Sequence, residues 1–176
     1  NYSAVRQQCE QNVREYYKKS VLLRNDDHFE IQFKEIFDHM AALYGLDDMQ
    51  KDQLMQWEIE GELEAGIPLV PQISLLKKYI AEGNDIVLIS DMYLPKEVIV
   101  KLLQKADPLL ATLPLYVSSE VGHQKTTRKL FLHVYSDLDY CYEKWIHIGD
   151  NRFADQVQPE MLGIQTAPIP VPEWTP

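Results

Sequence analysis

The sequence predicts an α/β protein with a parallel sheet, preceded by an all-helical region. Residues beyond position 71 alternate between short apolar runs and amphipathic stretches, which is typical of a parallel sheet built from right-handed crossovers. The run IVLIS at residues 86–90 is apolar on both faces, as strands buried in parallel sheets are. Residues 1–66, in contrast, show only helical periodicity. The change of pattern near Pro71 therefore separates two kinds of structure.

The N-terminal region is expected to contain three helices. Their predicted ranges are residues 2–19, 29–43 and 47–65. In the first two, apolar or aromatic side chains recur every three to four positions. The third begins with acidic residues, where the helix dipole favours them. Gly45 is placed to end the second helix, because glycine adopts the left-handed conformation that follows many helices. Gly66 and the two prolines after it interrupt the pattern and mark a subdomain boundary.

The region after this boundary is expected to contain four strands and four helices in alternation. The predicted strands are residues 86–90, 115–118, 145–149 and 164–167, and the predicted helices are residues 73–81, 95–105, 125–134 and 154–162. Pro95 suits the first turn of a helix, because it lacks an N–H and its φ is already helical. The domain organisation that follows is a helical subdomain at 1–66, an α/β core at 67–170 and an extended, proline-rich tail at 171–176.

Composition excludes several classes of function. The net charge of −10 argues against a nucleic-acid or anionic-membrane surface, because both need clustered lysine and arginine. Cys9 and Cys141 show no CxxC or Cys/His ligand spacing, so neither a disulfide framework nor a zinc site is predicted. No run reaches the roughly 18 apolar residues that a membrane helix needs. We therefore expect a cytoplasmic protein.

Polar side chains follow the carboxyl ends of three predicted strands. Ser90 and Asp91 follow the first, Ser118-Ser119-Glu120 and then Lys125 follow the second, and GDNRFAD at residues 149–155 follows the third. The carboxyl ends of parallel strands open on one edge of a sheet. We therefore expect a hydroxyl, an ammonium group and two carboxylates around one crevice, a set that suits phosphoryl transfer.

Each candidate residue suits one part of that chemistry. Ser90 and Asp91, with nearby backbone N–H groups, can form a phosphate-binding site. Lys125 supplies a compact positive charge that offsets the phosphate, and it is the candidate catalytic residue. Asp150 and Asp155 are hard oxygen ligands of the kind that Mg²⁺ prefers. Three further side chains are candidates for contact with the substrate: Tyr93, His123 and Asn151.

Each residue also has a purely structural interpretation. Ser90 or Asp91 could serve only as a helix cap or a turn former. Lys125 could be an ordinary surface lysine, and Tyr93 could pack against its neighbours. His147 lies inside a predicted strand and is expected to be a core histidine. The occurrence of all three strand-end motifs in one order favours the functional interpretation of the set.

The order of these motifs resembles that of the haloacid dehalogenase-like superfamily. The strand ending in Ser90-Asp91, the segment SSEVGHQK ending at Lys125 and the segment WIHIGDNRFAD ending at Asp155 are similar to its second, third and fourth motifs. More narrowly, WEIEGELEAGIP, ISDMYLP and WIHIGDN resemble a branch found beside, or fused to, glycosyltransferases of surface-polysaccharide pathways. The resemblance covers most of the chain.

The resemblance implies both a fold and an activity. The fold is a Rossmann-like parallel sheet with residues 1–66 as an inserted helical cap. The activity is a magnesium-dependent phosphohydrolase or phosphotransferase acting on a small phosphorylated metabolite, such as a sugar phosphate. By that match Ser90 is the phosphate-binding hydroxyl, Lys125 balances charge, and Asp150 with Asp155 lies on the magnesium side. A fused or associated glycosyltransferase is the implied partner.

One motif of the superfamily is absent from this sequence. Its members begin with a strand ending in DxD, whose first Asp becomes an aspartyl-phosphate and whose second is the general acid/base. The Asp26-Asp27 pair follows no apolar run and does not match. We therefore expect the nucleophile upstream of Asn1, an inactive chain when it is alone, and a sheet without its first, central strand. Such a gap predicts a hydrophobic slot, or a strand from another chain, between the strands ending at Ser90 and Gly149.

Two alternatives remain open at this point. The chain could be a non-catalytic module that binds a partner, such as a glycosyltransferase, or retains a phosphorylated ligand. It could also be a flavodoxin-like or receiver-type domain, but that interpretation leaves residues 1–66 unexplained.

Overall fold

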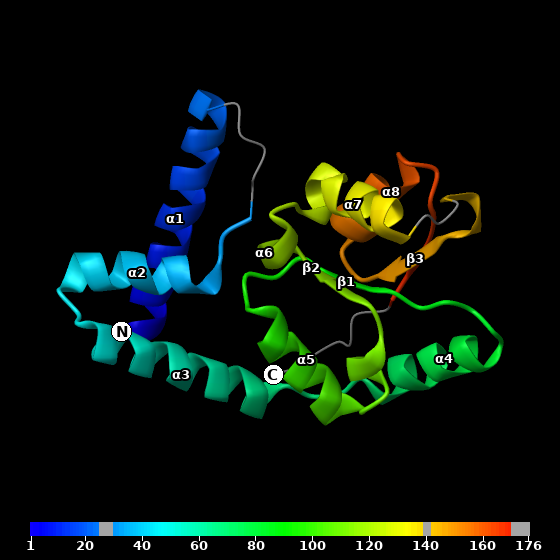
Figure 1. Ribbon diagram of the computed structural model, residues 1–176, viewed down its shortest axis with the longest axis horizontal. Helices are drawn as coiled ribbons and strands as arrows, with labels where there is room; N and C mark the ends of the chain where they lie inside the picture. Colours follow the sequence, from blue (N-terminus) through cyan, green and yellow to red (C-terminus); the bar gives the residue numbers. More distant parts are fainter. Residues whose placement is uncertain (25–29, 139–141, 170–176) are drawn as a thin grey trace. The chain divides into compact units, whose positions relative to one another are not determined.

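The computed structural model describes residues 1–24, 30–138 and 142–169 of the chain. These residues belong to two compact units, Asn1–Gly122 and His123–Pro176, whose elements are labelled in Figure 1. The predicted subdomain boundary near Gly66 lies inside the first unit. The expectations for Asp26-Asp27 and for the tail from position 170 onward fall outside the described residues. No helix within those residues combines the length and the apolar character that crossing a membrane requires.

The strands form two separate two-stranded sheets, both parallel. In the first unit β1 (Leu88–Ser90) pairs with β2 (Leu115–Val117), with Leu88 opposite Leu115. In the second unit β3 (Ile146–Gly149) pairs with β4 (Gln165–Pro168). The prediction of an α/β protein with parallel strands is confirmed. Within the described residues no ladder joins β1 to β3, so each keeps an edge without a paired strand.

The first unit contains most of the helices. They are α1 (Tyr2–Arg24), α2 (Phe33–Tyr44), α3 (Asp48–Ala65), α4 (Val70–Ala81), α5 (Lys96–Ala106), the 3₁₀ turn η1 (Leu110–Thr112) and the short α6 (Ser118–Val121). Gly45 ends α2 with φ of +68°, as predicted. Asp47 accepts a hydrogen bond from the Gln50 N–H, and the Gln50 side chain accepts one from the Asp47 N–H, so a capping box starts α3.

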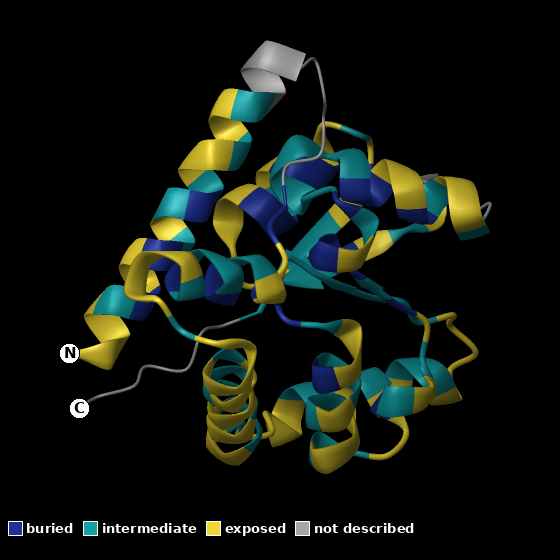
Figure 2. Ribbon diagram, turned by 60° about the vertical axis from the view of Figure 1, so that its left-hand side comes forward, coloured by how far each residue is buried: buried dark blue, intermediate teal, exposed yellow. Residues whose placement is uncertain are grey.

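The core of the first unit joins the N-terminal helices to the segment that follows β1. Its buried side chains are Cys9, Val13, Ile31, Phe33, Ile36, Phe37, Met40, Leu94 and Val98. Figure 2 shows the buried stretches of α1 and α2 in dark blue. Phe33 and Phe37 pack against each other with ring centroids 4.9 Å apart, and full burial of each contributes about 1.5–3 kcal/mol. Leu94 and Val98 lie after β1, so the helical region shares one core with the loop that follows β1 and with the start of α5.

Two helix starts in the first unit differ from prediction. Helix α4 begins at Val70 and includes Pro71 in its first turn, where a missing N–H costs nothing. Pro95 has φ of −57° and ψ of 143°, so it precedes α5 as the capping residue and is not its first helical residue. The predicted strand at 86–90 is shorter than expected, because only Leu88–Ser90 is paired.

The second unit departs further from the predicted helices. The predicted helix at 125–134 is divided at Arg128, which has φ of +66°, into the 3₁₀ turn η2 (Lys125–Thr127) and α7 (Lys129–Leu138). The predicted helix at 154–162 consists of the π-helical turn η4 (Arg152–Val157) and the short α8 (Gln158–Glu160). A 3₁₀ turn, η3 (Tyr142–Lys144), precedes β3.

Candidate functional site

Ser90 is the last residue of β1 and Asp91 begins the loop that follows, whose next three residues are fixed by hydrogen bonds. The Met92 N–H donates to Ser118 Oγ at 2.8 Å. The Tyr93 carbonyl accepts from the Phe33 N–H at 2.9 Å. The Leu94 carbonyl accepts from Ser119 Oγ at 3.0 Å. The backbone beside Ser90 is therefore held from the start of α2 and from the start of α6.

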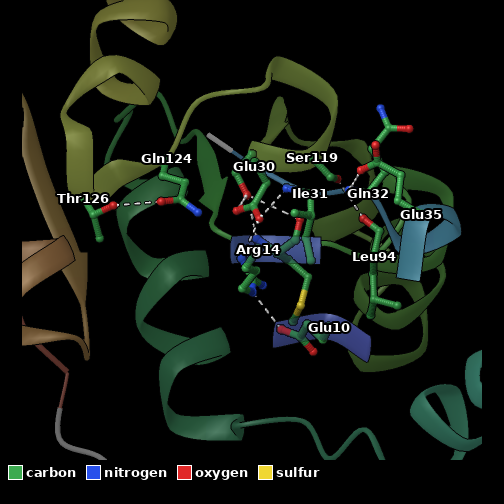
Figure 3. A network of polar contacts seen from close by, with 12 residues as sticks. Glu10, Arg14, Glu30, Ile31, Gln32, Glu35, Leu94, Ser119, Gln124 and Thr126 are labelled. Carbon is green, nitrogen blue, oxygen red and sulfur yellow. Dashed lines mark hydrogen bonds and ion pairs between the residues drawn. The ribbon is translucent and has the colours of Figure 1, made fainter. Parts of the chain in front are cut away.

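A buried carboxylate, Glu30, lies beside Arg14 and Ile31 (Figure 3). Its Oε1 accepts from Arg14 Nη1 at 3.1 Å and from the Ile31 N–H at 3.0 Å, and its Oε2 accepts from Ser118 Oγ at 2.8 Å. Arg14 also donates to Glu10. A carboxylate that is 2% exposed needs such donors, because an unpaired buried charge is very costly. No spacing or motif in the sequence marks Glu30, so its role could not be predicted from the sequence.

Tyr93 packs within the first unit. Its ring stacks on Phe33 with centroids 6.3 Å apart and an interplanar angle of 6°. The guanidinium of Arg6 makes a second contact with the Tyr93 ring, at 5.1 Å from its centroid. Arg6 also forms an ion pair with Glu58. Burial raises the pKa of the Tyr93 hydroxyl. The predicted contact between Tyr93 and a substrate stays a prediction.

The second unit brings Lys125 and Asp155 together. Asp155 is 2% exposed. Its Oδ1 accepts from Lys125 Nζ at 2.5 Å and from His147 Nε2 at 2.8 Å, and its Oδ2 accepts from the Asn151 N–H at 3.0 Å. Because a carboxylate can only accept, His147 carries its proton on Nε2. The pairing places a lysine ammonium at a fixed position at the start of η2.

The pKa of Asp155 reflects these contacts. Burial alone would raise the pKa of its carboxyl group. The hydrogen bonds from His147 and Lys125, the positive charge of Lys125 and the Asn151 N–H outweigh burial, and they hold the pKa of Asp155 well below its ordinary value. Asp155 is therefore an ionised partner of Lys125 at neutral pH.

The GDNxxxD motif has a structural explanation in this geometry. A Cβ added to Gly149 would lie 2.3 Å from Asp155 Cγ, so only glycine leaves room for the carboxylate. Asn151 Oδ1 accepts from the N–H groups of Phe153 and Ala154, which caps η4. His147 is buried with its ring edge-on to Phe131, as expected of a core histidine, but its bond to Asp155 was not foreseen.

Asp150 and His123 differ from the other candidates in their surroundings. Asp150 is exposed at the carboxyl end of β3. Within the described part of the chain, His123 Nδ1 is shielded from solvent and has no hydrogen-bond partner. Their predicted roles, as a metal ligand and a substrate contact, stay predictions.

The candidate residues are divided between the two units. Ser90, Asp91 and Tyr93 belong to the first unit, and the rest belong to the second, namely His123, Lys125, Asp150, Asn151 and Asp155. The predicted convergence of Ser90 with Lys125 and Asp150, and the predicted slot beside their strands, stay predictions.

The described carboxylates do not by themselves form a magnesium site. No group of three or more His, Cys, Asp or Glu side chains suited to a metal ion occurs among the residues that the structure describes. Both oxygens of Asp155 already accept hydrogen bonds, one of them from an ammonium group. The exposed carboxylate of Asp150 has the chemistry that magnesium prefers, but further oxygen ligands would be needed. Magnesium binding stays a prediction.

Comparison with models of known protein families and with curated proteins finds no match for this chain.

Proposed function

We propose that the chain supplies the phosphate-binding and charge-balancing parts of a haloacid dehalogenase-like phosphohydrolase or phosphotransferase, whose substrate is a small phosphorylated metabolite such as a sugar phosphate. The observation that carries the proposal is the buried pair of Lys125 and Asp155 beside a parallel strand. The Lys125 side chain is only 12% exposed, whereas most lysines lie in solvent. A lysine fixed in this way supplies a positive charge at a defined place.

The residues of this chain have distinct parts in the proposed reaction. Ser90 Oγ and loop N–H groups hold the phosphate oxygens, and Lys125 offsets the negative charge of the phosphate. The attacking carboxylate and the general acid/base are expected on a strand encoded upstream of Asn1. The helical region is proposed to act as the cap that selects the substrate.

The edge of β1 supports the proposed additional strand. None of its residues is fully buried, although the strand is apolar on both faces. Helix α4 likewise contains no buried residue despite its apolar composition. An added strand would remove part of this apolar surface from water, at about 25 cal/mol per Å².

The test is a phosphatase assay on the gene product that includes the sequence upstream of Asn1. We expect hydrolysis of sugar phosphates that depends on MgCl₂ and stops with EDTA. Lys125→Met should lower kcat/KM by about 10²–10³-fold, because it removes a positioned charge from the transition state. Lys144→Met, at an exposed lysine of the same unit, is the matched control and should change little. The proposal fails if no DxD strand is encoded and a panel of phosphate esters is not hydrolysed.

A second candidate function is a non-catalytic module that retains a phosphorylated ligand or binds a glycosyltransferase. It is favoured by the engagement of both Asp155 oxygens inside the protein. Calorimetric titration of this chain with inorganic phosphate, without magnesium, separates the two candidates when it is combined with the phosphatase assay on the longer product. Binding without hydrolysis by the longer product supports the module.

A further inference from the structure

Glu30 and Ser118 form a buried relay of hydrogen bonds between α1 and the loop after β1. One oxygen of Glu30 accepts from Arg14 and from the Ile31 N–H (Figure 3). The other accepts from Ser118 Oγ. Ser118 has no exposed surface. Glu30 and Ser118 are therefore both shielded from water. In such surroundings hydrogen bonds to a charged group are short and strong.

The carboxylate determines which way the Ser118 hydroxyl points. A serine hydroxyl has one proton, and Glu30 Oε2 is a charged acceptor 2.8 Å away. The proton is directed to Glu30, so a lone pair of Ser118 Oγ is available for the Met92 N–H, which donates at 2.8 Å. The Met92 carbonyl, at 3.4 Å, is the weaker alternative acceptor for the same proton. Without the carboxylate the hydroxyl would lose this preference.

Met92 is the loop residue nearest to Ser90 that the relay reaches. The two residues after it are held by other groups, because Tyr93 accepts from the Phe33 N–H and Leu94 accepts from Ser119. The bond between Ser118 and Met92 therefore fixes the end of the loop that adjoins Ser90. Because its N–H is used inside the protein, Met92 is not a donor to a bound phosphate.

We propose that Glu30 and Ser118 are positioning residues that fix the backbone of the phosphate-binding loop beside Ser90. Neither touches the proposed substrate, and both act through Met92. The inference deepens the proposed function and rests on it for the identity of the ligand. A buried carboxylate adds little net stability compared with a well-packed apolar residue, so its value lies in the single geometry that it imposes on the hydroxyl.

The experiment compares three variants of this chain with the wild type. Ser118→Ala removes the acceptor of the Met92 N–H, and Glu30→Gln keeps the shape of the side chain but removes its charge. Phe37→Leu is the control, because it weakens the core of the same unit without touching the relay. Amide hydrogen exchange measured by NMR on the unliganded chain reports on the loop. Titration with inorganic phosphate, followed by calorimetry, reports on the ligand.

We expect Ser118→Ala and Glu30→Gln to accelerate exchange of the Met92 amide by about tenfold or more, as loss of one buried hydrogen bond implies. Amides in the middle of α2 should change little in these two variants. Phe37→Leu should accelerate the α2 amides at least as much as Met92. The apparent Kd for phosphate should rise by about tenfold in the two relay variants and stay near the wild-type value in Phe37→Leu.

Three results would contradict the inference or the proposed phosphate site. Unchanged exchange at Met92 in both relay variants overturns the inference. Faster exchange with unchanged phosphate affinity overturns the link between the loop geometry and binding. A wild-type chain that binds no phosphate overturns the proposed phosphate site, while the exchange data still decide whether Glu30 and Ser118 fix the loop.

Discussion

The carboxylate of Asp155 occupies the space where a side chain on residue 149 would lie, since an added Cβ would be 2.3 Å from Asp155 Cγ. We predict that Gly149→Ala displaces Asp155 and breaks its bonds to Lys125 and His147, at a cost of about 3 kcal/mol or more. Urea unfolding of the second unit measures that cost. In the double variant Gly149→Ala/Asp155→Ala the clash is gone, so the combined cost should be well below the sum of the two. Strictly additive costs would contradict this packing explanation.

The same carboxylate should make stability depend on pH in the acid range. The pKa of Asp155 is lower in the folded chain than its ordinary 3.8, so folding disfavours the bound proton. Its stabilising contribution is therefore complete above about pH 4 and is lost as pH falls through the folded pKa. We predict that Asp155→Asn is less stable by on the order of 3 kcal/mol at pH 7, and that the difference shrinks below about pH 4. Urea midpoints of both chains between pH 7 and pH 3 test this, and a constant difference would contradict it.

Arg128 separates η2 from α7 and is the non-glycine residue with positive φ among those described, at +66°. This conformation costs an L-residue with a Cβ roughly 1 kcal/mol. Its hydrogen bond to Gln158, at 3.4 Å, is long and offsets little of that cost. We predict that Arg128→Gly raises the melting temperature, or at worst leaves it unchanged. His133→Gly, within α7, should lower it, because glycine inside a helix costs about 1 kcal/mol. A lower melting temperature for Arg128→Gly would show that the arginine contacts outweigh the strain.

The sequence predicted those elements whose ends carry a local chemical signal. Gly45 and Asp47 were correctly assigned to a helix end and a helix start, because a left-handed glycine and an acidic cap act within one turn. The division of the helix at Arg128 could not be predicted, since arginine carries no preference for positive φ. Arg128 adopts it directly after the 3₁₀ turn η2, where its N–H donates to the Lys125 carbonyl at 2.8 Å.

The candidate site shows the same limit at the level of motifs. Lys125 and Asp155 were named as candidates because each lies in a motif that follows a predicted strand. The structure pairs the two side chains. Glu30 was not found, because its partners Arg14 and Ser118 are 16 and 88 positions away along the chain. Contacts between residues so distant in sequence leave no periodic signal, and they become visible only when the chain is folded.

At the scale of the whole molecule, the edge of β1 that faces away from β2 has no paired strand among the described residues. The Leu88 N–H donates to the Pro114 carbonyl, on the β2 side. In a parallel ladder successive residues direct their N–H and C=O groups to opposite sides. Leu88 and Ser90 therefore face β2, and Ile89 faces the opposite edge. A strand added at that edge would pair first with Ile89.

The Ile89 amide therefore provides a test of the proposed missing strand. In this chain its exchange with solvent should be faster than that of the Leu88 amide, which is bonded to Pro114. In a gene product carrying the proposed DxD strand, we predict that Ile89 exchange slows by on the order of 10²-fold or more, as pairing in the centre of a sheet implies. Leu88 is the internal control, because it is bonded with or without the added strand. If Ile89 exchanges equally fast in the longer product, the upstream segment does not pair with β1. The proposed phosphate-binding loop would then lack the neighbouring nucleophile that the proposed reaction requires.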